Sequence, residues 1–142
     1  MNNSYNAQNA YKETGIKTAS QGQLIVEMYK GAIKFLNLAE RHIEDKNYME
    51  ANEYMQRVQD IVNELRYSLD HEKGGEVSKN LEALYDFMYR SLVKANMDND
   101  LELLDQVRNM LKELLESWQE VQKKAAAKGK VNKAAKLSVN PK

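Results

Sequence analysis

Cysteine is absent from this 142-residue chain, proline occurs once and histidine only twice. Without cysteine there is no disulfide framework, no thiolate metal site and no cysteine nucleophile, which excludes zinc fingers, iron–sulfur proteins and thiol oxidoreductases. No apolar run approaches the roughly 18 residues of a membrane span, and the first residues lack the charged and apolar regions of a signal peptide. We therefore expect a soluble, cytoplasmic protein that needs no cofactor and does not insert into a membrane.

Acidic side chains are missing after Glu120. All 21 acidic residues lie at or before that position, whereas the 21 basic residues divide into 14 before it and seven lysines after it. Residues 1–120 thus carry a formal charge of −7 and the remainder +7. An acidic body disfavours nucleic acid as a partner, and the basic segment has no aromatic ring on which a base stacks. We interpret residues 123–142 as a basic, Lys/Ala-rich tail that is solvated and partly frayed.

Turn-forming residues are scarce, because glycine and proline together make up seven of the 142 residues, against about 12% in average proteins. Between the few breaks, apolar side chains recur at three- and four-residue steps in four segments, the pattern of amphipathic helices. These segments are 21–44, 48–71, 76–95 and 99–122. Three of them begin with a candidate capping box, in which a Gln or Glu follows the capping residue by three positions. The capping residues are Ser20, Asn47 and Asn99.

Four helices with one-sided apolar stripes and short connections pack best as antiparallel neighbours. We predict an all-α fold, an antiparallel up-down-up-down four-helix bundle over residues 20–122, with an N-terminal strap or short helix over residues 1–19. The Gly74-Gly75 pair is expected to form a left-handed or very tight turn. Gly31 interrupts the first helix at a cost of about 1 kcal/mol relative to Ala, and we expect a neighbouring helix or ligand to approach closely there.

The chain shows no catalytic pattern. A di-iron bundle needs Glu-x-x-His on two helices, but Ala39 precedes His42 by three residues and Ser68 precedes His71. Two lone histidines also disfavour a His-centred triad or a zinc site, and we expect both to have a structural role at helix C-termini. The glycine pair lacks the strand and the Lys-Ser/Thr of a phosphate loop. We therefore expect no catalytic residue, no metal site and no enzymatic activity.

Adaptable apolar side chains are instead in excess, with eight tyrosines and seven methionines. Many of them fall outside the narrow stripes that a bundle core requires. Methionine suits surfaces that repack, and tyrosine combines an apolar ring with a polar tip. The excess favours a groove that receives an amphipathic helix of a partner. The predicted partner-binding residues are Leu24, Met28, Tyr29, Ile33, Tyr85 and Tyr89.

Apolar residues also occur at wide spacing in the N-terminal segment, which shows no helical period of its own. They are Tyr5, Tyr11 and Ile16. Because this segment precedes a helix with a wide apolar arc, we hypothesise an N-terminal latch that covers part of the groove until a partner displaces it.

Between about residue 10 and residue 122 the chain carries a series of short motifs. They are Thr18-Ala-Ser20, Leu24-Ile25, Tyr29, Gly31-Ala32-Ile33, Glu64-Leu65, Leu69-Asp70, Glu72-Lys73-Gly74-Gly75-Glu76, Asn80-Leu81, Leu84-Tyr85-Asp86, Leu92, Ala95-Asn96, Asp100, Leu114-Leu115-Glu116 and Trp118. The run Leu-Asp-x-Glu-x-Gly-Gly-Glu, followed by Leu-Tyr-Asp, is the most specific part. On these residues the chain resembles the flagellin-specific export chaperones of the bacterial flagellum, the FliS family. It departs from the family pattern at Gln21, which is usually Pro, and at Lys30, which is commonly acidic.

The resemblance implies an antiparallel bundle that binds the C-terminal segment of newly made flagellin in the cytoplasm. Such binding prevents premature polymerisation or degradation and assists delivery to the flagellar export apparatus, the second implied partner. Three alternatives remain open at this point. One is a self-associating bundle that uses its extra apolar arc as a homodimer seam, and another is an adaptor for a different secreted or regulatory protein. The third, which the acidic body disfavours, is a nucleic-acid role through the lysine tail.

Overall fold

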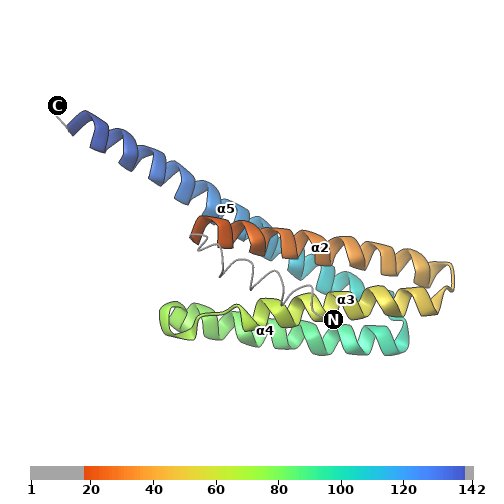
Figure 1. Cartoon of the computed structure of the whole chain (residues 1–142). Helices are drawn as coiled ribbons and strands as arrows, with labels where there is room; N and C mark the ends of the chain where they lie inside the picture. The colour runs from red at the N-terminus through yellow and green to blue at the C-terminus, as the bar shows by residue number, and fades with distance from the viewer. Residues whose placement is uncertain (1–17, 140–142) are drawn as a thin grey trace.

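The computed structural model describes residues 18–139 and, among them, the side chains of residues 21–128. Its helices are α2 (Thr18–Glu44), α3 (Tyr48–Tyr67), α4 (His71–Asp98) and α5 (Leu101–Val139). Consecutive helices run antiparallel and are joined by turns of two or three residues (Figure 1). Helix α2 packs on α3, α3 on α4, α4 on α5 and α5 on α2, so the four helices close into a ring. The predicted four-helix bundle is confirmed. The predicted strap lies outside the described residues, except for its last two positions, which belong to α2.

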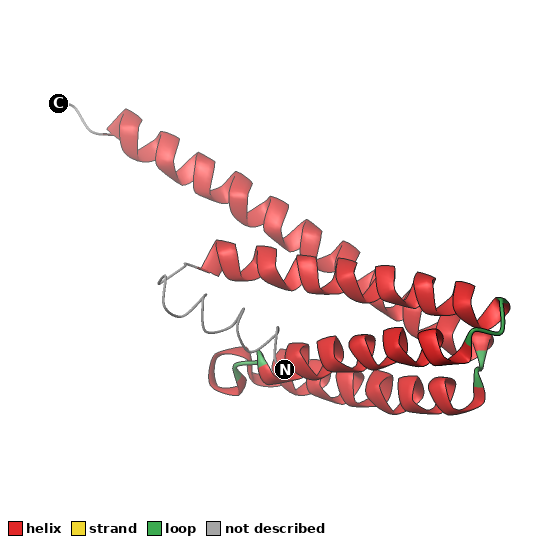
Figure 2. Ribbon diagram, turned by 45° about the vertical axis from the view of Figure 1, so that its right-hand side comes forward, coloured by secondary structure: helices red, strands yellow, loops and turns green. Residues whose placement is uncertain are grey.

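The core is built from one face of each helix, and Figure 2 shows only helices and short turns over the described part of the chain. The largest fully buried side chains recur at the three- and four-residue steps that the sequence pattern predicts. They are Tyr29, Leu36, Met55, Val58, Val62, Leu65, Tyr85, Met88, Leu92, Leu104, Val107 and Leu111. Full burial of a side chain of this size contributes about 1.5–3 kcal/mol. Packing of these faces therefore accounts for the helix arrangement.

Helix α4 begins five residues earlier than predicted, with a kink near its start. The Asp70 carboxylate accepts two backbone N–H bonds from the first turn, each 3.1 Å long, and so caps the helix. Gly75 has a φ of 52° and a ψ of −125°, a conformation that only glycine adopts readily. A Cβ atom on Gly74 would lie 1.7 Å from Ser78 Oγ. Gly75 thus has the positive φ that favours glycine, but the pair forms a kink within α4 and not the predicted turn before it.

The predicted caps are wrong in detail at all three helix starts. Ser20 lies inside α2, which includes Thr18. Asn47 occupies the N-cap position of α3, but its side chain makes no capping hydrogen bond. Asn99 ends α4 in a left-handed conformation, with a φ of 51°. The cap of α5 is the next residue, Asp100, whose carboxylate accepts the backbone N–H of Leu103 at 3.0 Å.

Helix α5 is longer than predicted. It continues through the lysine-rich segment to Val139, and Figure 1 shows it running past the start of α2 and away from the bundle. Lysine and alanine are strong helix formers, Gly129 costs only about 1 kcal/mol relative to Ala, and the next proline is Pro141, so the local sequence permits the helix to continue. The helical backbone continues to Val139, and fraying of the tail from residue 123 stays a prediction.

The two histidines occupy different positions. His42 lies in the last turn of α2, as expected, and its ring stacks on that of Tyr54 with 5.6 Å between the ring centroids. His71 is instead the first residue of α4, and its Nε2 lies 3.2 Å from a carboxylate oxygen of Glu82. The expected role at a helix C-terminus therefore applies to His42 and is wrong for His71.

A polar cluster fixes α5 against α2. The Arg108 guanidinium donates to Glu40 on α2 at 2.6 Å and to Asp105 on its own helix at 2.6 Å, and it also donates to Asn37 at 2.9 Å. The Arg108 side chain is only 11% exposed, and its hydrogen bond to Glu40 raises its already high pKa. Since bidentate, shielded arginine–carboxylate pairs are among the stronger polar contacts, this cluster holds the two helices in register.

No neighbouring helix approaches Gly31 closely among the described residues, and approach of a ligand there stays a prediction. A Cβ atom there would lie 3.8 Å from Ile61 Cδ1 on α3, an ordinary van der Waals distance. Gly31→Ala should therefore raise the free energy of unfolding by about 0.5–1 kcal/mol, because alanine loses less backbone entropy in a helix interior. Urea denaturation followed by circular dichroism measures this change. Gly74→Ala is the matched control and should lower the urea midpoint, because its Cβ would collide with Ser78. A lower midpoint for Gly31→Ala would contradict the prediction.

Candidate functional site

The structure divides the six predicted partner-binding residues into two groups. Tyr29 and Tyr85 are buried in the core, with exposed fractions of 0% and 1%. The other four are half-buried at the margin of the core. They are Leu24, Met28, Ile33 and Tyr89. Contact of these four with a partner stays a prediction, whereas the two tyrosines are covered by the bundle itself.

The buried tyrosines belong to a hydrogen-bonded chain that joins three helices. The hydroxyl groups of Tyr29 on α2 and Tyr85 on α4 are hydrogen-bonded to each other. The indole N–H of Trp118 on α5 donates to the Tyr29 hydroxyl at 3.2 Å. A buried hydroxyl without a partner is costly, and each of these groups supplies the partner that another one needs.

Both tyrosines remain neutral. Burial raises the pKa of Tyr29, although its hydrogen bonds to Tyr85 and Trp118 act in the opposite direction. Burial also raises the pKa of Tyr85, and the nearby Tyr29 raises it further because two phenolates would repel each other. Each hydroxyl therefore keeps its proton well into the alkaline range, and the three-helix connection does not change with pH near neutrality.

Helix α2 exposes different predicted residues on its two flanks. Gly31 and Phe35 face α3, because a Cβ at Gly31 would lie beside Ile61 and the ring centroids of Phe35 and Tyr54 are 5.8 Å apart. By helical spacing, Leu24 and Met28 share that flank. Ile33 lies on the opposite flank with Asn37, whose side chain contacts Arg108 of α5.

The structure thus places Leu24 and Met28 on one side of α2 and Ile33 on the other. The predicted residues do not line a single groove.

A first pocket lies at the end of the bundle, where the start of α2, the end of α3 and the start of α4 meet. This end pocket has a volume of about 340 Å³. Its walls include Ile25, Leu81 and Trp118, and of the six predicted residues only Tyr85 lines it. The Asp70 cap and the glycine kink of α4 shape its rim. The most specific sequence motif therefore builds this end of the molecule.

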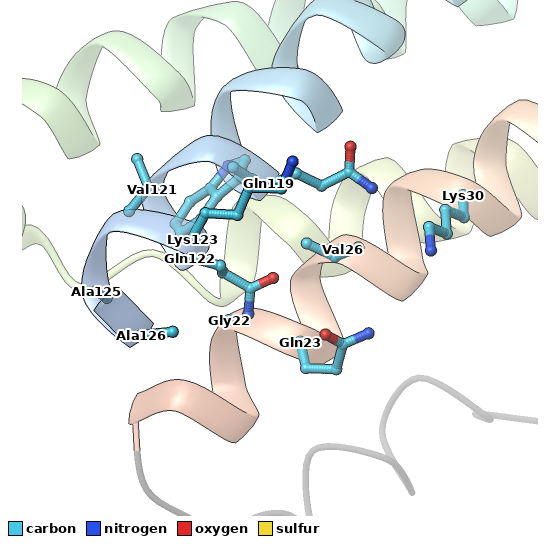
Figure 3. A pocket seen from close by; sticks show the side chains of 11 residues that line it. Gly22, Gln23, Val26, Lys30, Gln119, Val121, Gln122, Lys123, Ala125 and Ala126 are labelled. Atoms are coloured by element: carbon cyan, nitrogen blue, oxygen red, sulfur yellow. The ribbon is translucent and has the colours of Figure 1, made fainter. Parts of the chain in front are cut away.

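A second pocket is a groove between α2 and α5, with a volume of about 730 Å³. Val26 of α2 and Trp118 of α5 contribute to its walls, and Figure 3 shows Gln122 reaching from α5 toward Gly22 on α2. Gly22 and Trp118 line both this α2/α5 groove and the end pocket. Sequence reasoning missed this groove, although the position of Trp118 at the end of the apolar stripe of α5 was a signal for it.

Metal chemistry finds no support in the described part of the chain, where no three histidine or acidic side chains gather closely enough to hold an ion. None of the described helices has the length and apolar character needed to cross a bilayer. The three residues of the predicted latch lie outside the described residues. They are Tyr5, Tyr11 and Ile16.

The hydrogen-bonded chain predicts non-additive effects of substitution. Tyr29→Phe should lower the free energy of unfolding by about 1–3 kcal/mol, because it leaves the Tyr85 hydroxyl and the Trp118 N–H without their buried partner. Tyr85→Phe should cost less. The double variant should cost less than the sum of the two single variants, because removing both hydroxyls leaves only the indole N–H unpaired. Urea unfolding of all four proteins measures the coupling, and additivity within about 0.5 kcal/mol would contradict it.

Comparison with known proteins places these features in a family. The family model described as "Flagellar protein FliS" matches residues 1–125. The flagellar secretion chaperone FliS of Bacillus subtilis (strain 168) is 34% identical over 115 residues, which cover 81% of this chain and 85% of that protein. The FliS chaperone of Salmonella typhimurium is 35% identical over 80% of this chain and 85% of its own length. The FliS chaperone of Campylobacter jejuni is also 35% identical, over 81% of this chain and 90% of its own length. The chain therefore belongs to the FliS family of flagellar proteins.

Proposed function

We propose that this protein is a cytoplasmic flagellar secretion chaperone that binds the C-terminal segment of flagellin, prevents its premature polymerisation and assists its export. The observation that carries the proposal is the family match over residues 1–125, together with relatives named flagellar secretion chaperone that align over about four fifths of the chain. The resemblance in the sequence motifs supplies flagellin and the export apparatus as the partners.

The apolar flank of α2 suits such a partner. Leu24 is only half-buried and lies on the same face as Met28, beside α3. Covering apolar area of this kind contributes about 25 cal/mol per Å². The ordering of a disordered partner segment costs about 2–5 kcal/mol or more of that energy, so a large interface can remain releasable. Binding and hand-over then follow from competition and mass action, without a catalytic step.

The latch hypothesis extends this proposal to residues 1–17. Tyr5, Tyr11 and Ile16 would compete with flagellin for the apolar flank of α2. Deletion of residues 1–17 should therefore tighten flagellin binding and increase the fluorescence of a dye that binds apolar surface. Calorimetry and dye titration of the full chain and the deletion variant measure the two effects. Unchanged affinity together with unchanged dye fluorescence would count against the latch.

Substitution of the apolar flank tests the flagellin proposal itself. Leu24→Asp should weaken binding of a peptide that contains the flagellin C-terminal segment about ten- to a hundredfold, because burial of a leucine contributes about 1.5–3 kcal/mol. Ile33→Asp, on the opposite flank, reports whether the partner also contacts that side. Isothermal titration calorimetry measures the affinities, and circular dichroism verifies that each variant folds.

Met97→Asp is the matched control, since Met97 is 76% exposed in the last turns of α4, at the other end of the bundle. It should bind the peptide as the unchanged protein does. Absence of heat with the unchanged protein would overturn the flagellin proposal. Unchanged affinity in both Leu24→Asp and Ile33→Asp would instead place the binding surface elsewhere.

A further inference from the structure

The core-facing stripe of α5 extends beyond the helices that cover it. Leu111 and Trp118 lie on this stripe, and helical spacing continues it through Gln122 to Ala125. Gln122 already lies opposite Gly22, one turn from the start of α2 at Thr18. Among the described residues, the stripe therefore extends past α2 within about one further turn of α5.

The α2/α5 groove forms where this cover ends. Its apolar lining combines Val26 of α2 with Trp118, Val121, Ala125 and Ala126 of α5 (Figure 3). Val121 is 57% exposed, whereas Val26 is 2% exposed. One wall of the groove is thus firmly packed, and the other is an apolar helix face that remains open to solvent.

The charged side chains that line the groove are lysines, and Glu27 lies beside it, where it accepts a hydrogen bond from Gln23 at 2.8 Å. Lys30 and Lys123 line it together with glutamine side chains, and no carboxylate lines it. Lys30 lies 3.7 Å from Glu27 on the preceding turn, but both side chains are about half exposed, and a pair of this kind contributes little. Residues 1–120 carry 21 acidic and 14 basic side chains, so the groove is a local positive region on an acidic protein.

The helix extension continues this positive region. Lys124 and Lys128 are exposed on α5, and the sequence places three more lysines before the helix ends at Val139. The family model ends at residue 125. The lysine extension therefore lies beyond the match to the family model and begins where the groove opens.

We propose that the α2/α5 groove and the lysine extension together form a docking surface for an acidic amphipathic helix of a protein partner. The apolar floor would receive the apolar face of that helix, and the lysines would pair with its carboxylates. Helix-in-groove recognition uses this combination of anchors and flanking charges, and complementary charge accelerates the encounter.

Charge and composition argue against the other occupants. Residues 1–17 contain two lysines and one glutamate, so a lysine-rimmed groove does not attract them. Arginine and aromatic residues favour both base stacking with nucleic acid and binding to a membrane surface. The segment after Glu120 contains neither kind of residue. The α2/α5 groove also lies on the flank of α2 opposite Leu24 and Met28. Ile33 shares the flank of the groove but does not line it, so the proposal rests on none of the predicted flagellin contacts.

The only tryptophan of the chain, Trp118, lines the groove and reports on its occupation. The probe is a synthetic helical peptide of about 18 residues, or five turns, with leucine at the three- and four-residue steps and glutamate on the other faces. Its matched counterpart carries lysine in place of glutamate. The acidic peptide should shift the Trp118 emission to shorter wavelength and bind more weakly as the salt concentration rises. The lysine peptide should bind at least about tenfold more weakly, since it brings like charges together.

Two variants of the full-length protein locate the binding. Val121→Asp should abolish the emission shift, because it places a carboxylate on the open apolar wall. The triple variant Lys123→Gln, Lys124→Gln and Lys128→Gln should weaken binding about three- to tenfold, because each exposed ion pair contributes only a small free energy. Met97→Asp provides the control at a similarly exposed apolar position far from the groove and should bind normally. Circular dichroism verifies the fold of each variant.

Three results would overturn the proposal. The first is equal binding of the acidic and lysine peptides, or no binding of either. The second is acidic-peptide binding that neither Val121→Asp nor the lysine variant changes. The third is another occupant, shown either by an emission change on deletion of residues 1–17 or by a dimer in sedimentation that Val121→Asp dissociates. Because no flagellin is present in these experiments, their outcome is separate from that of the flagellin titration.

Discussion

The buried contact among Tyr29, Tyr85 and Trp118 is the constraint on which the rest of the bundle depends. It joins α2, α4 and α5 through a buried hydrogen bond between the two tyrosines and a partly buried one from Trp118. Trp118 lines both the end pocket and the α2/α5 groove, and Tyr85 lines the end pocket. The walls of both pockets are therefore anchored to the core. A partner that binds in either place meets a surface whose shape is set before it arrives, which reduces the entropic cost on the chaperone side.

Sequence periodicity predicts the four helices well, because a core-facing residue must recur every three or four positions to meet its neighbours. It predicts the ends of the helices poorly. Asp70 caps α4 because the chain turns there, and the glycine pair that looks like a break is accommodated as a kink at Gly75. Asn99 resembles a cap for the next helix, but its left-handed backbone ends the previous one. Capping depends on the direction in which the chain enters the helix, and a three-residue motif does not contain that direction.

The candidate site was harder to predict for a related reason. Periodicity assigns each residue an angle around its own helix, but it does not say which neighbour occupies that angle. Tyr29 and Tyr85 are 56 positions apart in the sequence, and their polar hydroxyl groups suggest a position at the surface. The sequence does not show that each hydroxyl is the hydrogen-bond partner of the other. Leu24 and Ile33 look like parts of one arc, yet α3 lies beside one and α5 beside the other. The α2/α5 groove depends on where α2 starts relative to the end of the α5 stripe, which is a relation between two distant segments.

The separation of roles within the molecule follows from this arrangement. The core network is neutral and shielded, because burial keeps both tyrosines protonated. Its contribution to stability is therefore insensitive to pH and salt near physiological conditions. The proposed partner surfaces lie outside it, on half-buried apolar side chains and exposed lysines, where binding energy would respond to area, charge and salt. Partner exchange at these surfaces does not require the hydrogen bonds of the core to open. Binding and release of a flexible chain, as proposed, would therefore leave the folded core intact.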